Sequence, residues 1–301
     1  MTSELWLLDR GPTQIAAIIR NGDFIDIARK NENRRTTTGS RFIGKIVEKN
    51  SNLRALFVDL GLARPGFLPL SKTTKPLTIG QSVDVTCVSE LSALKGPSLK
   101  LNAIPTEKAE TPTLIFDADD PVSVLRNRKE EIDLALCNEP ALVDCLRAKL
   151  PTTQKISPVA KSNYSDNWQQ DLLEYCEALD DPTWIFDAST GASLLFEPGQ
   201  TLLAIDVNSG SGAVRDEEER LKINLIAAEA IAKQIKLRQL SGQIVVDFLG
   251  LERRESRQLV TQKVEKRLAI LPNRFEVVPM NSLGLVCLSL QRLYPAFHES
   301  K

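Results

Sequence analysis

Two aspartates stand at the ends of two apolar segments in the second half of the chain. Asp206 ends the run LLAID, and Asp247 ends the run IVVD. Each run is long enough for a buried strand, and ligands of open α/β sheets bind beyond the carboxyl ends of the strands. Two carboxylates that face one spot repel each other unless a cation lies between them. Because Mg²⁺ takes few protein oxygens and keeps several waters, the pair predicts a site for Mg²⁺, with Mn²⁺ as a second candidate.

Two further residues could take part in phosphoryl chemistry beside this pair. Asn208 follows Asp206 by two residues and lies on the same side of an extended chain, where it could orient a metal-bound water or a phosphate. Arg274 begins the apolar run FEVV, and a cation near the metal could stabilise a pentacoordinate phosphorane. Simpler roles stay open, because aspartates at strand ends also cap turns, Asn-Ser-Gly often forms a turn, and Arg274 could be a solvated side chain.

A basic segment follows Asp247 on a predicted helix. It could be a phosphate track, but interleaved glutamates make a surface of salt bridges an equal alternative. The basic residues are Arg253, Arg254, Arg257, Lys263, Lys266 and Arg267.

The elements expected around the aspartates follow from the pattern after residue 182. WIFDA and SLLFE read as a hairpin across Ser189-Thr190-Gly191, and TLLAIDVN, QIVVDFL and FEVVPM read as strands. Residues 215–240 and 255–268 have helical periodicity between those strands. This β-α-β-α-β order predicts a largely parallel, helix-covered sheet.

The first third of the chain reads as β structure. Residues 4–27 form a hairpin pattern punctuated by Gly11-Pro12 and Asn21-Gly22. Five short strand patterns then follow between residues 39 and 106, which predicts a small closed barrel. Aromatic side chains on such barrels stack on the bases of single strands, and cations contact the phosphates. The candidates are Phe57 and Phe67 for stacking and Lys45 and Lys95 for phosphate, although either phenylalanine could belong to the core.

The middle of the chain is predicted to be helical. Apolar residues recur at helical spacing from Val122 to Leu150, residues 151–167 are polar and read as a loop, and WQQDLLEYCEAL resumes a helix. Together the patterns predict an α/β (α+β) protein of several domains.

Bulk properties narrow the class of protein. A chain of 301 residues suits two or three domains, and a net charge of −1 excludes a general cationic coat for nucleic acid. The five cysteines form no CxxC pair and His298 is the only histidine, so no zinc site is expected. The odd cysteine count fits a reducing compartment, and neither a signal peptide nor a membrane-spanning run is present. We expect a cytoplasmic location and no membrane partner.

Several of these strings resemble the ribonuclease E/G family. GKIVEKNSNLRALFVDLGLARPGFLPL is similar to its S1 RNA-binding domain, and AIDVNS, NLIAAEAIAKQIKLRQLSGQIVVDF and LGLVCLSLQR are similar to its deoxyribonuclease-I-like catalytic domain. PVSVLRNRKEEIDLALCNEPALVDCL resembles its RNase-H-like subdomain. The resemblance implies an RNase-H-like subdomain in two parts (1–36 and 107–181), an inserted S1-type OB barrel (37–106) and a catalytic domain (182–301).

The resemblance also implies roles for individual residues. Asp206 and Asp247 match the family's magnesium-binding aspartates, and Asn208 matches the asparagine that helps to place the scissile phosphate. Arg274 matches an arginine near that site, and Phe57 and Phe67 match aromatics of the RNA-gripping surface. The implied activity is magnesium-assisted hydrolysis of single-stranded RNA by an endoribonuclease, which leaves a 5′-phosphate, in bacterial RNA processing, rRNA processing or mRNA decay.

The chain also departs from the family pattern. Only about ten residues occupy the place of the family's 5′-sensor subdomain, so no 5′-end sensing of that kind is expected. Neither the zinc-linking cysteine motif nor a scaffold tail is seen, and we expect a monomer or weak dimer rather than a zinc-linked tetramer. Gly250 replaces the family's second acid, and Ser282 replaces an arginine. A catalytically weak or inactive RNA-binding protein of the same fold is therefore the second hypothesis, while a ribosome-associated S1 protein would leave the Asp206 and Asp247 pair unexplained.

Overall fold

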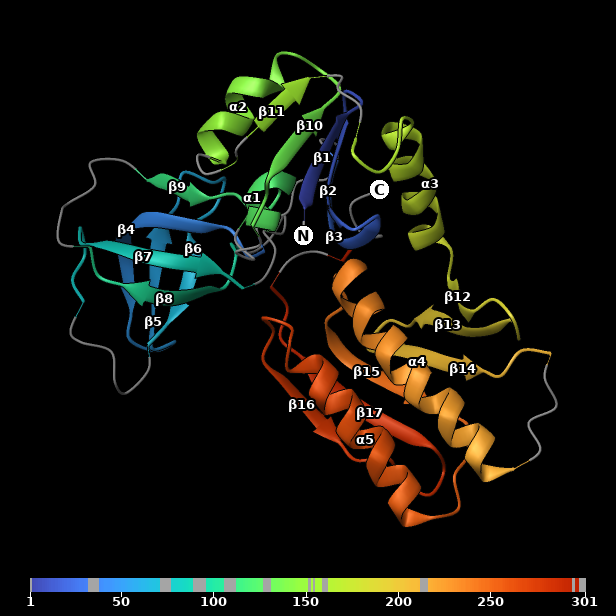
Figure 1. Ribbon diagram of the computed structural model, residues 1–301. Coiled ribbons are helices and arrows are strands. Elements are labelled where there is room, and N and C mark those ends of the chain that lie inside the picture. The colour runs from blue at the N-terminus through green and yellow to red at the C-terminus, as the bar shows by residue number, and fades with distance from the viewer. Residues whose placement is uncertain are drawn as a thin grey trace.

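The structure, a computed structural model, is a mixed α/β architecture whose strands form three separate sheets (Figure 1). It confirms the α/β class expected from the sequence patterns. The residues that the structure describes are 2–31, 38–70, 77–88, 96–105, 112–126, 131–150, 153, 155–158, 162–211, 216–293 and 296–297.

The first sheet combines strands from two distant parts of the chain, in the order β11-β10-β1-β2-β3. β1 runs parallel to β10 and β10 parallel to β11, while β2 is antiparallel to both of its neighbours. Helix α3 covers one face of the sheet, and α1 and α2 cover the other. The bounds are β1 Ser3–Asp9, β2 Thr13–Arg20, β3 Asp23–Asn31, α1 Pro121–Arg126, β10 Leu134–Cys137, α2 Leu142–Lys149, β11 Lys155–Pro158 and α3 Trp168–Asp180.

Two sequence predictions for this region are wrong. Leu134–Cys137, expected within a helical stretch, is strand β10, and Lys155–Pro158, expected in a loop, is strand β11. A run of four apolar residues fits a helix face or a buried strand equally well. Here β10 is buried beside β1, whose free edge offers backbone hydrogen bonds that a helix would leave unmade.

The second sheet is curled, in the order β6-β5-β4-β7-β8, with β9 also paired to β4. Its two end strands meet at one bridge between Phe67 and Ser98, where the Phe67 N–H donates to the Pro97 carbonyl at 2.8 Å. Gly96 permits this approach, since a Cβ there would lie 1.8 Å from the Pro65 carbonyl oxygen. The bounds are β4 Arg41–Asn50, β5 Ala55–Asp59, β6 Gly66–Pro69, β7 Ser82–Cys87, β8 Leu99–Ala103 and β9 Thr113–Phe116. Because β9 belongs to this sheet, the sheet extends past the domain boundary expected at residue 106.

The third sheet has the order β12-β13-β14-β15-β17-β16. Only β14 and β15 are parallel among its described pairs, so the expected largely parallel sheet is wrong. The hairpin of β16 and β17 folds back and places β17 between β15 and β16, which makes the FEVV strand an edge strand. The bounds are β12 Thr183–Asp187, β13 Ala192–Pro198, β14 Leu203–Asn208, α4 Glu217–Leu237, β15 Gly242–Asp247, α5 Arg254–Leu268, β16 Phe275–Val278 and β17 Leu285–Leu290.

Helices α4 and α5 pack on the same face of the third sheet (Figure 1). Ile205, Val207, Ile244 and Val246 point into that core and are at most 3% exposed. Strand side chains alternate between faces, so the residues between them point to the opposite face. That face, which carries Asp206 and Asp247, is half-buried to exposed.

The C-terminal end of α4 joins the third sheet to the first. Gln239 Nε2 donates to the Ile27 carbonyl at 2.9 Å, and the Lys236 ammonium lies 3.5 Å from the buried Asp26 carboxylate. Phe297 returns to the core of the first sheet, where the Arg29 guanidinium lies 4.0 Å above its ring. Within the described ranges, none of the helices is long and apolar enough to cross a membrane.

The core of the third sheet gives a stability prediction. Ile244 is fully buried under α4 and α5, so Ile244→Ala should lower the free energy of unfolding by about 2–5 kcal/mol through lost burial and a cavity. Urea unfolding followed by circular dichroism measures the change. Ile270→Ala is the matched control, because Ile270 is 72% exposed and should unfold like the parent. Equal loss in both variants would contradict the described core.

Candidate active site

Asp206 and Asp247 are direct register partners on the parallel strands β14 and β15. Neighbouring strands lie about 4.8 Å apart, and residues in register point to the same face. Both carboxylates therefore leave the third sheet side by side, at the carboxyl ends of its parallel pair. Asp206 is half-buried and Asp247 is exposed. The sequence predicts two acids at the ends of neighbouring strands, and the strand register pairs Asp206 directly with Asp247.

The electrostatic environment of the pair disfavours two negative charges. The pKa of Asp247 is raised, first by burial of its carboxyl and then by repulsion from Asp206. Among the described residues, neither aspartate forms an ion pair with lysine or arginine. Asn208 Nδ2 donates to Asp206 Oδ2 at 2.9 Å, which fixes that carboxylate without neutralising it. The result is a concentrated negative charge suited to a cation.

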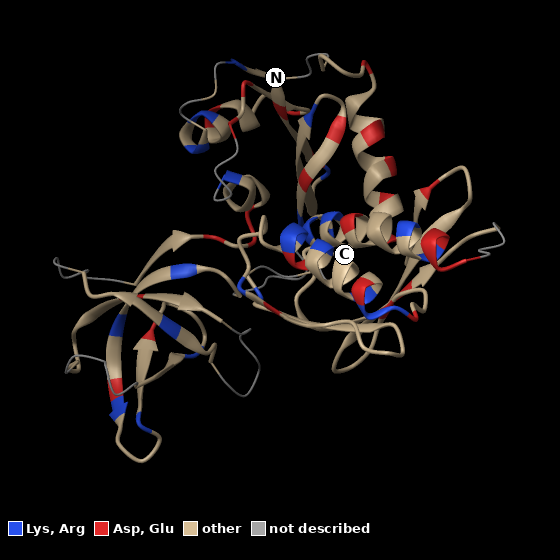
Figure 2. Ribbon diagram, turned by 60° about the horizontal axis from the view of Figure 1, so that its bottom comes forward, with Lys and Arg blue, Asp and Glu red and all other residues tan. Residues whose placement is uncertain are grey.

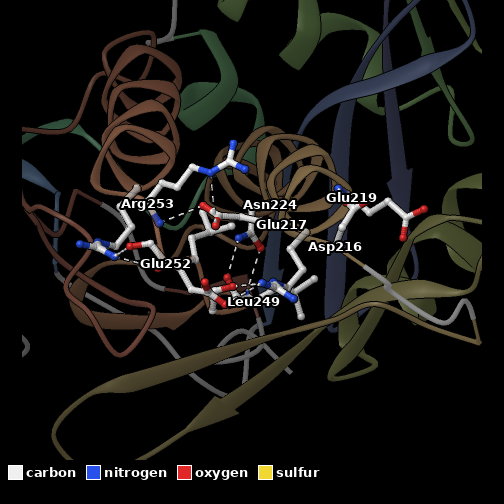
Figure 3. A network of polar contacts seen from close by, with 11 residues as sticks. Asp216, Glu217, Glu219, Asn224, Leu249, Glu252 and Arg253 are labelled. Atoms are coloured by element: carbon white, nitrogen blue, oxygen red, sulfur yellow. Dashed lines mark hydrogen bonds and ion pairs between the residues drawn. The ribbon is translucent and has the colours of Figure 1, made fainter.

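A buried asparagine on α4 holds the loop that follows Asp247. Asn224 is 0% exposed; its Nδ2 donates to the Leu249 carbonyl at 2.8 Å, and its Oδ1 accepts from the Leu249 N–H at 3.0 Å (Figure 3). Arg220 Nε adds a hydrogen bond to the Gly250 carbonyl at 2.8 Å. These contacts replace the interstrand backbone hydrogen bonds that are no longer formed after β15 ends. They fix the backbone just beyond Asp247.

The first turn of α4 contacts the same loop at its end, beside Arg253. Asp216 caps the helix by accepting from the Glu219 N–H at 2.9 Å, and Glu217 Oε1 accepts from the Arg253 N–H at 3.0 Å (Figure 3). The helix start and the end of the loop are therefore tied to one another. Because Arg253 caps α5, the start of α5 is set by α4.

A tight turn between β16 and β17 flanks Asp247 on its other side. Gly284 has φ +94°, a conformation that favours glycine, and a Cβ there would lie 2.6 Å from the Phe248 carbonyl oxygen and 3.6 Å from Asp247 Oδ1. Asn281 Oδ1 accepts from the N–H groups of Leu283 at 2.9 Å and Leu285 at 3.0 Å. The turn therefore packs closely against Asp247 in one fixed conformation.

The loop after Asn208 is anchored to the β12–β13 turn. The Ser211 N–H donates to the Thr190 carbonyl at 2.9 Å, and Ser211 Oγ donates to the same oxygen at 3.1 Å. Gly210, at φ +74°, passes so close that a Cβ would lie 2.1 Å from the Thr190 oxygen. Asn208 thus stays at the edge of the acid pair.

Arg274 lies at the other end of the third sheet and is not near the acids. The neighbouring Phe275 pairs with Leu290, which in turn pairs with Gly242 at the start of β15. Asp247 is the last residue of that strand. At about 3.4 Å per residue, Gly242 and Asp247 lie about 17 Å apart along β15. Because β15 and β16 are both antiparallel to β17, they run in the same direction, and the start of β16 lies at the end of the sheet opposite Asp247. The geometry gives Arg274 no role at the acid pair.

The RNA-binding candidates lie on the outer face of the curled sheet. Phe57 and Phe67 are cross-strand partners with ring centroids 5.9 Å apart; both are half-buried and outside the core. Lys45 is exposed and pairs with Asp59, which lies on the same side of β5 as Phe57. Figure 2 shows basic and acidic segments interspersed on the curled sheet. Lys95 lies outside the described residues.

The donor set suits an oxygen-preferring divalent cation. Two adjacent carboxylates are typical protein ligands of Mg²⁺, which fills its remaining positions with water. No cluster of three or more His, Cys, Asp or Glu side chains suited to a metal occurs among the described residues. Asp206 and Asp247 would hold the ion, as a site with few protein ligands.

Sequence reasoning missed the supporting residues Asn224, Asn281 and Gly284. A polar residue at a core position of the amphipathic 215–240 helix was the available signal for Asn224, because a buried amide needs hydrogen-bond partners. Asn281 and Gly284 carried a turn signal, Asn followed three residues later by Gly, but this signal does not place the turn beside Asp247.

Comparisons with known proteins agree on one family. The family model described as "Ribonuclease E/G family" matches residues 103–293. Ribonuclease E of Nostoc sp. is 37% identical over 108 residues, which cover 35% of this chain and 16% of that protein. A chloroplastic ribonuclease E/G-like protein of Arabidopsis thaliana is 34% identical over 112 residues, covering 36% and 11%, and ribonuclease E of Escherichia coli is 33% identical over 114 residues, covering 37% and 11%. The matched segments are thus a small part of these longer relatives.

The raised pKa of Asp247 predicts a pH-dependent stability difference. Above that pKa the folded protein carries the cost of the ionised pair, and below the ordinary pKa of aspartate the cost is absent in both states. In metal-free buffer, Asp247→Asn should therefore be more stable than the parent near pH 7, by less than about 1 kcal/mol because the group is largely exposed. The difference should vanish as the pH falls through the Asp247 pKa.

Urea unfolding with EDTA between pH 3 and 7 measures this difference. Asp187→Asn is the control of opposite sign, because hydrogen bonds from Ser189 lower the pKa of Asp187 and its ionised form stabilises the fold. That variant should lose stability at neutral pH only. An Asp247→Asn protein less stable than the parent at pH 7 would refute the described repulsion.

Proposed function

The chain belongs to the ribonuclease E/G family, and on this premise we propose that it is an endoribonuclease that cleaves single-stranded RNA with the assistance of Mg²⁺. The observation that carries the proposal is the register pairing of Asp206 with Asp247 on one open sheet face. Two adjacent carboxylates without a cationic partner among the described residues repel each other and do not stabilise the fold. The same arrangement is well suited to bind a metal ion.

The chain's own residues would each have a defined part in this reaction. Asp206 and Asp247 would hold the ion, and the hydrogen bond from Asn208 fixes one oxygen of the Asp206 carboxylate. When bound, Mg²⁺ lowers the pKa of a bound water and polarises the phosphodiester. Asn224 and the Asn281 turn keep the backbone on both sides of Asp247 fixed, so the site needs little reorganisation.

The substrate class follows from the curled sheet. Phe57 and Phe67 offer half-buried aromatic edges and faces outside the core, and such side chains stack on unpaired bases of any sequence. The net charge of −1 supports local binding on this sheet over a broad cationic surface. RNA processing or decay is the corresponding biological role, and cytoplasmic location and a monomer or weak dimer remain parts of the proposal.

The second candidate is an RNA-binding protein of the same fold with weak catalysis. The observation that favours it is Gly250, which stands three residues after Asp247 where the family resemblance implies a second acid. The backbone there is held by Arg220 and is free of crowding, since a Cβ on Gly250 would meet no atom within 4 Å. Space for a carboxylate exists, but the carboxylate itself is absent.

The acid pair gives the direct test of activity. A fluorescent A/U-rich single strand should be cleaved by the parent in Mg²⁺, and Asp206→Asn and Asp247→Asn should each lower the rate at least about 100-fold by removing a metal ligand. Gel analysis over time measures cleavage, and fluorescence anisotropy in EDTA checks that each variant still binds RNA. Arg274→Gln is the matched control and should retain the parental rate. The enzyme assignment would be contradicted if all four proteins cleaved equally, or if the parent bound RNA without cleaving it.

Gly250 separates the two candidates. If the missing acid limits the rate, Gly250→Asp should raise kcat about tenfold or more, the lower end of the range for a residue that supports a metal ligand. Gly250→Asn has nearly the same volume without the charge and should leave kcat unchanged. Equal kcat in both variants and the parent would mean that Gly250 does not limit catalysis.

A further inference from the structure

An apolar side chain projects from the turn beside Asp247. Leu283 is 74% exposed, and no other large apolar side chain of the described residues is more exposed. Exposed leucine costs hydration free energy, and single exposed apolar residues on mobile loops need no explanation. Leu283 differs from that case because its turn is held rigidly.

Five hydrogen bonds hold the turn in place. Asn281 Oδ1 accepts from the N–H groups of Leu283 and Leu285, Asn281 and Leu285 are joined by a backbone hydrogen bond of 3.1 Å, and the Gly284 N–H donates to the Asn281 carbonyl at 3.2 Å. The Phe248 N–H, directly after Asp247, donates to the Gly284 carbonyl at 3.2 Å. The tip of the turn therefore has a fixed position relative to the acid pair.

That position is within one nucleotide of the proposed metal site. A Cβ on Gly284 would lie 3.6 Å from Asp247 Oδ1. Since consecutive Cα atoms are about 3.8 Å apart, the Leu283 Cα lies at most about 9 Å from that oxygen. A base attached to a nucleotide whose phosphate sits at the acids can reach this side chain.

A groove adjoins the same turn, whose residues Asn281 and Ser282 line it. It has a volume of about 520 Å³ and runs between α5 and residues 279–282. Its wall is fixed by Thr261, whose Oγ1 accepts from the Met280 N–H at 3.1 Å. The lining is mixed: it includes the basic Arg254 and Arg257, the acidic Glu265, the polar Gln258, Gln262 and Ser282, and the apolar Pro279 and Met280.

We propose that Leu283 and this groove form a nucleotide subsite for the RNA residue next to the cleaved phosphate. Leu283 supplies an apolar contact to the face of the base, and the exposed Arg254 supplies charge to the adjoining phosphate. An apolar contact accepts all four bases, so the subsite selects unstacked RNA rather than a sequence. This proposal rests on the proposed function, because it uses the acid pair as the cleavage point.

The contact is tested without catalysis. Leu283→Trp places an indole at the tip, whereas Trp6 and Trp168 are buried and Trp184 is half-buried, so the emission of the parent protein is subtracted. In EDTA, titration with a single-stranded 12-nucleotide RNA should quench the new emission at the same RNA concentration that half-saturates fluorescence anisotropy. Ile270→Trp is the matched control, because Ile270 is similarly exposed and lies after α5 outside the groove, and its emission should not change.

Binding strength gives an independent readout. Leu283→Ser should weaken RNA binding about fivefold, since part of one leucine's burial is lost, and Leu283→Met should restore it. Arg254→Gln should reduce the slope of log Kd against log salt by about one, which loss of a packing contact would not do.

The outcomes separate this subsite from the enzyme assignment. Quenching in Leu283→Trp with no cleavage by the parent supports the subsite and removes the enzyme assignment. Cleavage by the parent with unchanged emission at saturating RNA overturns the subsite and leaves the enzyme intact. If RNA binds neither the parent nor Leu283→Trp, both the subsite and the enzyme assignment are wrong.

Discussion

The parallel pairing of β14 with β15 is the constraint on which the site depends. Helix α4 crosses over between the two strands, and the pairing sets Asp206 opposite Asp247 with no freedom of register. A slip of one residue would move Ile205 and Val246 out of the core and turn the carboxylates into it. The hydrophobic core under α4 and α5 therefore fixes the position of two like charges at the same sheet edge.

Helix α4 carries several of these requirements at once. Its apolar face closes the core, its buried Asn224 holds the loop after Asp247, and its first turn sets the start of α5 through Glu217. Its C-terminal end meets the first sheet at Ile27 through Gln239. The helix and the residues directly after it therefore contact the sheet core, the loop beside the acids and the first sheet.

Local patterns predicted the parts of this site that depend on neighbouring residues. The strands, the β12–β13 hairpin, the long helix and the acids at strand ends all follow from short-range periodicity and turn residues. Arg274 could not be placed, because its distance from Asp247 depends on how the β16–β17 hairpin folds back, and apolar patterns carry no strand order. Strand β10 was missed for a similar reason, since only its burial beside β1 distinguishes four apolar residues from a helix face.

Electrostatics links the acid pair to the rest of the proposed RNA path. The net charge is −1, and Asp206 and Asp247 concentrate negative charge where a phosphate must approach. RNA would be repelled from the acids unless cations offset that charge. In the proposed reaction a bound Mg²⁺ would do so at the acids, and the exposed Arg254 of the groove and Lys45 of the curled sheet would do so for other phosphates of the strand. Metal binding and RNA binding are therefore expected to be thermodynamically coupled, each strengthening the other by the same factor, because both relieve the same repulsion.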